Sequence, residues 1–259
     1  ELVLSAHADP AGPFDCGVKF MDGDFENQTR VCPFRAAGVD SRTNHLLPGM
    51  NRLYGRFEVR AKLSTGPGSI PTLWMMHQTW DYGWPYDGEF DLMEQWPDQT
   101  DKVKSAYHGG DPADQSHYSG HHHWWAKKDF YPQDGRKDTW HEDYHIWALE
   151  WDEHEARFYV DKWLVGITRN GQEVEADGKT YALKLPWNPF YWILFLTINV
   201  SNNDNWWENL WGDLDPDPSA FTSQAMHVDY VRVYDRCEDG DVGCVENTLS
   251  PWCPNPCQG

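Results

Sequence analysis

The sequence predicts an all-β fold, either a sandwich or a jelly roll, and three observations support this class. Apolar and polar residues alternate with a period of two in several segments, as in half-buried strands. Turn signals such as Gly-Pro, Asp-Gly and Asn-Gly separate those segments. No segment of helical length combines a 3.6-residue period with capping residues. We therefore expect short strands that pack on one another.

The strands follow from their patterns in chain order. Residues 56–63 alternate between charged and apolar side chains, which predicts a strand with one wet face and one core face. Residues 145–151 and 157–160 predict a hairpin. Residues 191–200 are a long apolar run, consistent with a strand that is buried on both faces, and residues 227–234 alternate again.

One domain is expected over residues 1–236, followed by a C-terminal tail over residues 237–259. A chain of 259 residues suits one large β domain, and no repeat or linker divides the first stretch. The tail is rich in Pro, Gly and Asp and holds four of the six cysteines. Because it has few apolar residues to bury, we expect a disulfide-stapled extension and not an independent domain.

The cysteine content predicts a secreted protein that passes through an oxidising compartment. We expect a Cys16–Cys32 bridge and two bridges within the tail. A zinc site in the tail is the alternative, but the tail lacks the paired CxxC of common zinc modules. Asn27 and Asn199 begin N-glycosylation patterns, and the second lies in an apolar run where we expect it to be unused. The sequence starts directly at ELVLSA with no signal-peptide pattern, so we expect a mature or trimmed form.

The charge and the aromatic content of the chain indicate which classes of partner and substrate to expect. A formal net charge of −20 repels polyanions, so we expect no nucleic acid partner and a neutral substrate. No run of about 18 apolar residues is present, so we expect no membrane partner, and we expect a monomer. Sixteen Trp residues are more than a core easily absorbs. We expect some of them to line a groove, where a flat ring stacks on the C–H face of a sugar.

Two histidine-rich segments raise the question of a metal site. Residues 108–125 contain a triple histidine that could bind a metal, but we favour a long surface loop beside the cleft. Residues 141–145 match the HExxH pattern of zinc proteases, which requires a helix. The residues that follow have strand character, and in a strand two residues four apart lie roughly 13 Å apart. We therefore reject the protease interpretation.

The clearest chemical signal is the run GEFDLME, residues 88–94. In a regular strand Glu89 and Asp91 share one face, whereas strict alternation sends Glu94 to the core face, where a lone carboxylate is expensive to bury. One extra residue at Leu92–Met93, a β-bulge, would return Glu94 to the face of the other two acids. The alternative is a strand that ends before Glu94.

Three carboxylates on one face repel one another, so at least one pKa should rise. Glycoside cleavage needs such an arrangement, with one ionised and one protonated carboxyl group. A solvated acidic face is the alternative. Such a face would not need apolar residues between the acids, nor the neighbouring Trp80, Trp84 and Trp96.

The run GEFDLME resembles the Glu-x-Asp-x-x-Glu signature of glycoside hydrolase family sixteen, in its bulged form. The chain is similar to the laminarinase-like (endo-β-1,3-glucanase) branch over most of residues 1–236. The similarity is carried, in the family's order, by residues 54–63, 73–76, 84–85, 144–151, 157–161 and 228–234. The resemblance implies a β-jelly-roll sandwich of two antiparallel sheets with a concave substrate cleft. Residues 1–236 would be its catalytic domain.

The resemblance also implies a retaining mechanism that requires no cofactor. Glu89 would be the nucleophile, Glu94 the acid/base, and Asp91 would tune their protonation and orientation. Trp80 is added to the expected substrate-binding residues because it lies close to the motif, and the others match family positions. These expected substrate-binding residues are Glu58, Arg60, Trp74, Trp80, Trp84 and His108.

A structural calcium is implied too. Relatives bind it through an earlier segment and an Asp of the closing strand, which Asp229 matches, although the usual upstream glycine has no counterpart. Residues 41–51, 109–140 and 201–207 also depart from the laminarinase pattern, and they would border the cleft.

The expected function is a retaining, endo-acting hydrolase of a β-linked polysaccharide, with β-1,3-glucan as the first substrate. An endo-β-galactanase or agarase-like enzyme of the same family is the alternative that the altered loops support. A transglycosylase would use the same residues. A non-catalytic β-glucan-binding protein belongs to a different class, and it would have no need of Glu89 and Glu94.

Overall fold

The computed structural model describes 14 stretches of the chain. All regular elements in them are β-strands, and none of them contains a helix that could cross a membrane. The stretches are residues 1–12, 14–15, 31–32, 34–41, 53–64, 69–77, 81–96, 101–111, 116–126, 140–176, 178–186, 190–198, 221 and 223–234.

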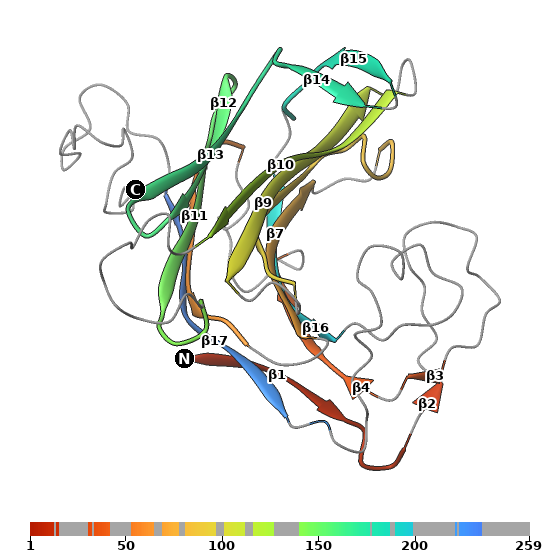
Figure 1. Ribbon diagram of the computed structural model, residues 1–259, viewed down its shortest axis with the longest axis vertical. Helices are drawn as coiled ribbons and strands as arrows, with labels where there is room; N and C mark the ends of the chain where they lie inside the picture. Colours follow the sequence, from red (N-terminus) through yellow and green to blue (C-terminus); the bar gives the residue numbers. More distant parts are fainter. Residues whose placement is uncertain are drawn as a thin grey trace.

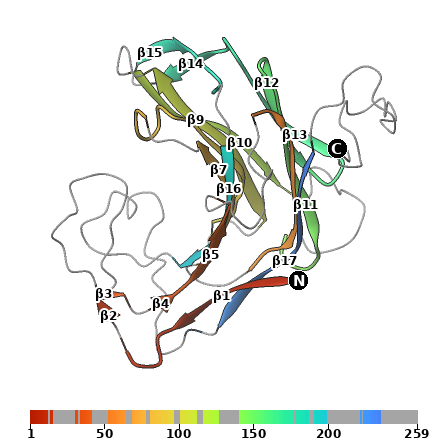
Figure 2. The same cartoon turned by 180° about the vertical axis from the view of Figure 1, so that it is seen from behind.

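Two large antiparallel sheets face each other, as Figures 1 and 2 show. The seven-stranded sheet has the order β13 (Trp163–Arg169), β12 (Glu155–Val160), β11 (His145–Trp151), β6 (Gly55–Lys62), β17 (Gln224–Tyr234), β1 (Leu2–Ala8) and β4 (Phe34–Arg35). The six-stranded sheet has the order β10 (Ser116–Ala126), β9 (Lys102–Asp111), β8 (Glu89–Glu94), β7 (Ser69–His77), β16 (Phe190–Ile198) and β5 (Ala37–Asp40). Two short pairs complete the described strands: β2 (Phe14–Asp15) with β3 (Val31–Cys32), and β14 (Glu173–Ala176) with β15 (Lys179–Ala182).

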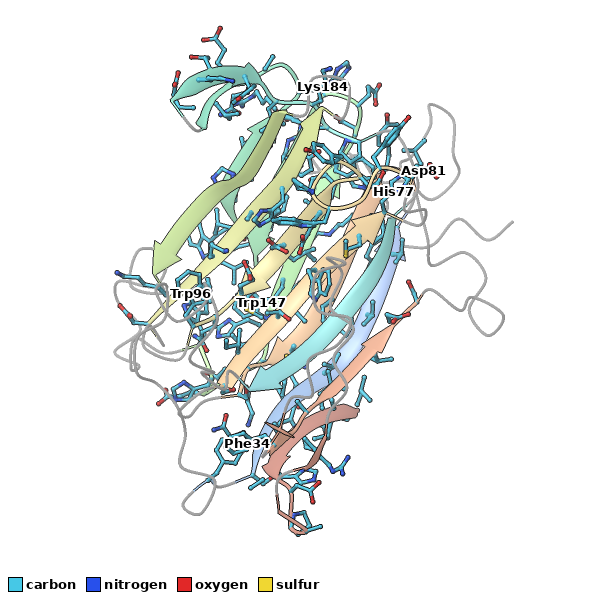
Figure 3. The ribbon with its side chains drawn as sticks, turned by 90° about the vertical axis from the view of Figure 1, so that its right-hand side faces the viewer. Phe34, His77, Asp81, Trp96, Trp147 and Lys184 are labelled. Atoms are coloured by element: carbon cyan, nitrogen blue, oxygen red, sulfur yellow. The ribbon has the colours of Figure 1, made fainter. Side chains whose placement is uncertain are left out.

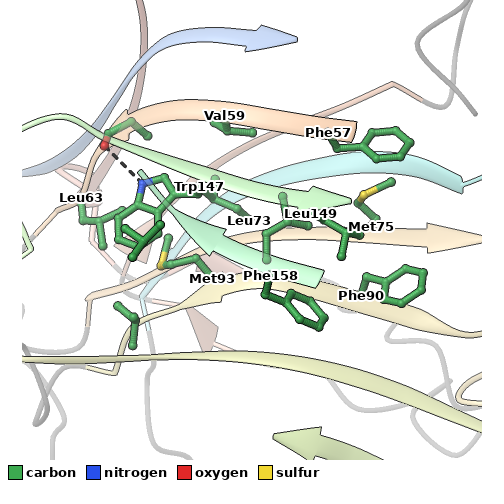
Figure 4. Close-up of a cluster of buried hydrophobic side chains, with 14 of the residues drawn as sticks. Phe57, Val59, Leu63, Leu73, Met75, Phe90, Met93, Trp147, Leu149 and Phe158 are labelled. Atoms are coloured by element: carbon green, nitrogen blue, oxygen red, sulfur yellow. Dashed lines mark hydrogen bonds between the residues drawn. The ribbon is translucent and has the colours of Figure 1, made fainter. Parts of the chain in front are cut away.

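The hydrophobic core lies between these sheets. Phe57 and Val59 of β6 pack in the same buried cluster as Leu73 of β7 and Phe90 of β8, which Figure 4 shows in close-up. Trp147 is fully buried in this cluster, and its indole N–H donates to the carbonyl of Ala61 at 3.3 Å. The alternation seen in the sequence therefore places one face of each sheet in the core.

Most of the predicted strands are confirmed. The segment 56–63 corresponds to β6, the predicted hairpin to β11 and β12, and the alternating segment 227–234 to β17. The apolar run 191–200 contains most of β16, which is hydrogen-bonded to β7 on one side and to β5 on the other.

The expectation of a long loop at residues 108–125 is wrong. Most of this segment belongs to β9 and β10, which pair antiparallel, with His121 opposite Tyr107 and Trp124 opposite Lys104. Backbone hydrogen bonds form a ladder whatever the side chains are, and aromatic rings favour the pleated surface of a sheet. The run of histidines conceals this strand because it removes the contrast between polar and apolar positions.

The HExxH segment has the strand geometry that the sequence indicates. His141 lies in a turn, and His145 is the first residue of β11. Nδ1 of His145 lies 2.9 Å from Oδ2 of Asp161, so this histidine joins the ends of β11 and β12. No helix presents the two histidines together.

Several predictions concern parts of the chain that lie outside the described residues. They are the tail 237–259, the cysteine pairings, the acceptors Asn27 and Asn199, and Trp80.

Candidate active site

The strand β8 contains the predicted bulge. Against β7, Met93 lies opposite Leu73, and the next pair along the ladder is Asp91 with Trp74. Leu92 therefore has no opposite residue on β7, and it is the extra residue of a β-bulge.

The neighbouring strand β9 shows the same shift from the other side. Asp91 lies opposite Ala106, whereas Glu94 lies opposite Lys104. Three steps on β8 thus match two steps on β9. The bulge returns Glu94 to the face that carries Glu89 and Asp91, as the sequence predicts.

A buried hydroxyl fixes the bulge. The Oγ atom of Ser105 on β9 donates to the carbonyl oxygen of Leu92 at 2.7 Å, and Ser105 has no exposed surface. A bulged residue interrupts the ladder, so a carbonyl there benefits from a side-chain donor. Ser105 therefore holds the distortion that re-aims Glu94.

One face of β8 packs in the core, and the other carries the three acids. Phe90 is fully buried in the core, with its ring centroid 4.9 Å from that of Tyr107 and 5.2 Å from that of Trp151. The opposite face of the six-stranded sheet is here named the active-site face. Figure 3 labels His77 and Trp96, which mark the two ends of the paired strands β7 and β8 on this sheet. By register the active-site face carries Thr72, Trp74, Met76, Glu89, Asp91, Glu94, Lys104, Ala106 and His108.

Asp91 is the central carboxylate and is almost fully buried, with 4% of its side chain exposed. Its Oδ2 atom lies 3.0 Å from Nε2 of His108. Burial opposes the charge on Asp91, but His108 outweighs this effect and lowers the pKa of Asp91. Burial likewise opposes the charge on His108, but Asp91 raises the pKa of His108. The contact therefore favours the ionised form of Asp91 and the protonated form of His108.

Glu89 is held by an indole. Nε1 of Trp84 donates to Oε2 of Glu89 at 2.5 Å. The loop that carries Trp84 is fixed by the buried side chain of Asp87, whose Oδ2 accepts the backbone N–H groups of Gly83 at 2.7 Å and of Tyr82 at 3.1 Å. This loop thus places a hydrogen-bond donor on Glu89.

Glu94 has a different partner. Its Oε2 atom lies 2.6 Å from Nζ of Lys104, with 21% of the Glu94 side chain and 8% of the Lys104 side chain exposed. The ammonium group also lies 5.3 Å from the ring centroid of Trp96. Each of the three acids on β8 therefore has its own donor or cation.

The electrostatics separate the middle acid from the outer two. Burial and then the charge on Asp91 raise the pKa of both Glu89 and Glu94 above that of an ordinary glutamate. His108 lowers the pKa of both glutamates, and Lys104 lowers that of Glu94. With Asp91 ionised, the outer pair can hold a proton in the pH range where ordinary glutamates have lost theirs.

The sequence profile described as Glycosyl hydrolases family 16 matches residues 49–191. This range includes β6 to β15 and the first two residues of β16. The chain belongs to this family. A "Beta-glucanase" of Rhodothermus marinus is 33% identical over 189 residues, which cover 70% of this chain and 57% of that protein. A "Glucan endo-1,3-beta-glucosidase A1" of Niallia circulans is 32% identical over 207 residues, which cover 78% of this chain and 27% of that protein. The match thus spans little more than half of the first relative and about a quarter of the second.

The fold agrees with the family. The laminarinase catalytic domain from Thermotoga maritima superposes with a TM-score of 0.65 and 24% identity, covering 91% of this chain and 78% of that domain. The β-jelly-roll architecture is thereby established for this member of family 16.

Three of the expected substrate-binding residues lie beside the acids. Trp74 and Trp84 pack against the buried Met76 in a small apolar cluster that is separate from the main core. The ring centroid of His108 lies 5.8 Å from that of Trp84. Trp74 and Trp84 are half-buried, so part of each ring is accessible on the active-site face.

Glu58 and Arg60 lie elsewhere, and the expectation that they share a cleft with the acids needs correction. They belong to β6 of the seven-stranded sheet, where Phe57 and Val59 point to the core, so Glu58 and Arg60 point outward on the opposite side of the sandwich. Glu58 is buried there and accepts a hydrogen bond from the hydroxyl of Tyr230 at 2.7 Å.

Asp229 lies on the same outer face and forms an ion pair with Arg60. Oδ2 of Asp229 accepts a hydrogen bond from Nη1 of Arg60 at 2.6 Å. Among the residues that the structure describes, no group of three His, Cys, Asp or Glu residues comes together to hold a metal ion. Asp229 is thus paired with Arg60, and the structural calcium stays a prediction.

Sequence reasoning missed Lys104 and Ser105. Both lie on β9, which was not among the strands predicted from the sequence because a loop was expected from His108 onward. The signal was present, because Lys104 and His108 lie four residues apart and share a face in a strand.

Proposed function

We propose that this protein is a retaining, endo-acting glycoside hydrolase that cleaves a β-linked polysaccharide, with β-1,3-glucan as its first substrate. The observation that carries the proposal is the bulge in β8, which gathers Glu89, Asp91 and Glu94 on one face beside Lys104 and His108. A solvated acidic face would not require a buried bulge or a separate partner for each acid.

In the first half of the reaction, Glu89 attacks the anomeric carbon as a carboxylate. Glu94 donates its proton to the glycosidic oxygen, so the bond between that oxygen and the anomeric carbon breaks and the aglycone leaves as an alcohol. Burial and the charge on Asp91 raise the pKa of both glutamates, so the pair can hold the proton that the reaction needs. His108 and the Trp84 N–H oppose this rise at Glu89, and Lys104 and His108 oppose it at Glu94.

The substrate assignment is supported by the relatives and by the charge. The two relatives named above are a β-glucanase and an endo-1,3-β-glucosidase by description. A net charge of −20 favours a neutral glucan over a sulfated or otherwise anionic polymer. Half-buried Trp74 and Trp84 beside the acids provide aromatic surfaces for sugar rings.

The direct experiment is a product analysis. The protein is incubated with laminarin, mixed-linkage β-glucan, β-1,3-galactan and agarose, and released oligosaccharides are resolved over time. We expect laminarin to be cut internally. Glu89→Gln should abolish cleavage, because an amide cannot form the glycosyl ester and the covalent route is then closed. Glu173→Gln, which removes an exposed carboxylate on β14, is the matched control and should retain full activity.

Other outcomes decide between the alternatives. Cleavage of galactan or agarose alone would favour the galactanase or agarase-like reading, which the altered segments 41–51 and 109–140 support. Transfer of the glycosyl group to a sugar acceptor would identify a transglycosylase. Tight glucan binding without any cleavage would favour a non-catalytic glucan-binding protein.

Secretion is the corresponding proposal for the cellular setting, and the six cysteines support it because disulfides form in oxidising compartments. Intact-mass measurement with and without reductant is the test. A gain of six hydrogens on reduction supports three disulfides, and no gain contradicts them.

A further inference from the structure

Lys104 lies outside the signature motif but faces its last acid. In the ladder between β8 and β9, Lys104 stands directly opposite Glu94. The two charged groups are 2.6 Å apart, and the Lys104 side chain is buried except for 8% of its surface. Such a close pair favours the ionised form of the carboxyl group.

The surroundings of Lys104 strengthen this preference. The ring of Trp96 covers the ammonium group on another side, at 5.3 Å from the centroid. A buried ammonium group is expensive to leave without its counter-ion. Protonation of Glu94 would remove the partner of Lys104, so the pair resists that protonation.

The other charged groups around Glu94 come from two strands. β8 contributes carboxylates that disfavour the charge on Glu94, and β9 contributes two cations that favour it. The residues of β7 that face this part of β8 by register carry no charge. Among the described side chains, the groups that face Glu94 are Glu89, Asp91, Lys104, His108, Thr72 and Trp74.

We propose that Lys104 is a positioning residue for the second half of the reaction, where it holds Glu94 as the carboxylate that activates the incoming hydroxyl. This inference rests on the proposed function. In that step a proton of water, or of a sugar hydroxyl, passes to Glu94. The oxygen bonds to the anomeric carbon, and the bond from that carbon to Glu89 breaks, which releases Glu89 as a carboxylate.

The same ion pair opposes the first half, in which Glu94 must carry a proton. Loss of Lys104 should therefore affect the two halves in opposite directions. It should retain Glu94 as an acid to higher pH, and it should slow breakdown of the glycosyl-enzyme. A merely structural role would lower both halves together.

The test compares Lys104→Met with Lys102→Met. Lys102 is exposed and lies on the same strand and face, so its loss removes an equal charge without the contact. We expect the alkaline limb of kcat/KM to move to higher pH in Lys104→Met and to coincide with wild type in Lys102→Met. With an aryl β-glycoside that has a good leaving group, Lys104→Met should show a burst of phenol followed by slow turnover.

Two further variants keep the test decisive. Lys104→Arg should retain the wild-type pH profile. If Lys104→Met does not fold, Lys104→Gln takes its place and should show the same shifted alkaline limb and the same burst. Carbon-13 NMR of the glutamate carboxyl groups, assigned with Glu94→Gln, should show Glu94 titrating at higher pH once the cation is lost. An unshifted limb in an active protein overturns the inference alone. A wild-type protein that cuts no glycan overturns the proposed function and the inference with it.

Discussion

The three acids of β8 are distinguished by their neighbours. Asp91 lies against His108, Glu89 accepts the indole N–H of Trp84, and Glu94 contacts Lys104. Two residues of the same type can therefore play different parts in one reaction, because the environment sets the protonation state of each.

Trp84→Phe tests this division of roles. Burial and Asp91 raise the pKa of Glu89, and the Trp84 N–H lowers it. Removing that donor should raise the pKa of Glu89 further, so a larger fraction of the nucleophile is protonated at low pH. The acidic limb of kcat/KM should then move to higher pH, while Trp163→Phe, at a 37% exposed residue of β13, leaves the profile unchanged. An acidic limb that stays in place would show that Glu89 is not the group that must lose its proton.

On the scale of the strand, the bulge is the device that brings the acids together. It could be predicted from the sequence because regular alternation would have buried Glu94 alone. The hydroxyl that fixes the bulge could not be predicted, since Ser105 lies on a neighbouring strand whose register is decided only in the folded sheet.

Ser105→Ala tests the bulge. The substitution leaves the carbonyl of Leu92 without its 2.7 Å donor in a buried place, and an unsatisfied buried group costs about 1–3 kcal/mol. That cost should appear as lost stability, and kcat should fall by up to about a hundredfold with little change in KM, because a reacting group displaced by about 1 Å can lose that much rate. Thr180→Ala, which removes an exposed hydroxyl on β15, is the control. An unchanged kcat in Ser105→Ala would mean that the bulge holds its shape without this bond.

Strand predictions succeeded where the sequence alternates or forms a long apolar run, and they failed where it does neither. The alternation in residues 56–63 identified β6, but the histidines and tryptophans of β10 gave no such contrast. Periodicity also shows which residues of one strand share a face, but it does not show which sheet the strand joins. That limit explains why Glu58 and Arg60 were expected beside the acids and lie on the other side of the molecule.

For the whole molecule, the core and the active-site face are two sides of the same sheet. Phe90, which separates Glu89 from Asp91, packs against Trp151 of the opposite sheet with ring centroids 5.2 Å apart. The position of the acids therefore depends on the packing between the two sheets.

Phe90→Ala measures that dependence. Deleting a fully buried ring should lower the free energy of unfolding by about 3–5 kcal/mol, through lost burial and the cavity that remains. Leu164→Ala, at a 45% exposed residue of β13, should change it by no more than about 0.5 kcal/mol. Denaturant titration followed by tryptophan fluorescence gives both values. A loss below about 1 kcal/mol for Phe90→Ala would contradict a tightly packed core under β8.

The central claim is that Glu89 forms a covalent bond to the sugar while Glu94 exchanges the proton. The most direct measurement uses a 2-deoxy-2-fluoro-β-glucosyl donor with a good leaving group, which slows breakdown of the glycosyl-enzyme, followed by peptide mass spectrometry. We predict one added glycosyl group on the peptide that contains β8, with fragment ions placing it on Glu89 and with no label in Glu89→Gln. A label on Glu94, or hydrolysis that releases the inverted anomer without any label, would contradict it.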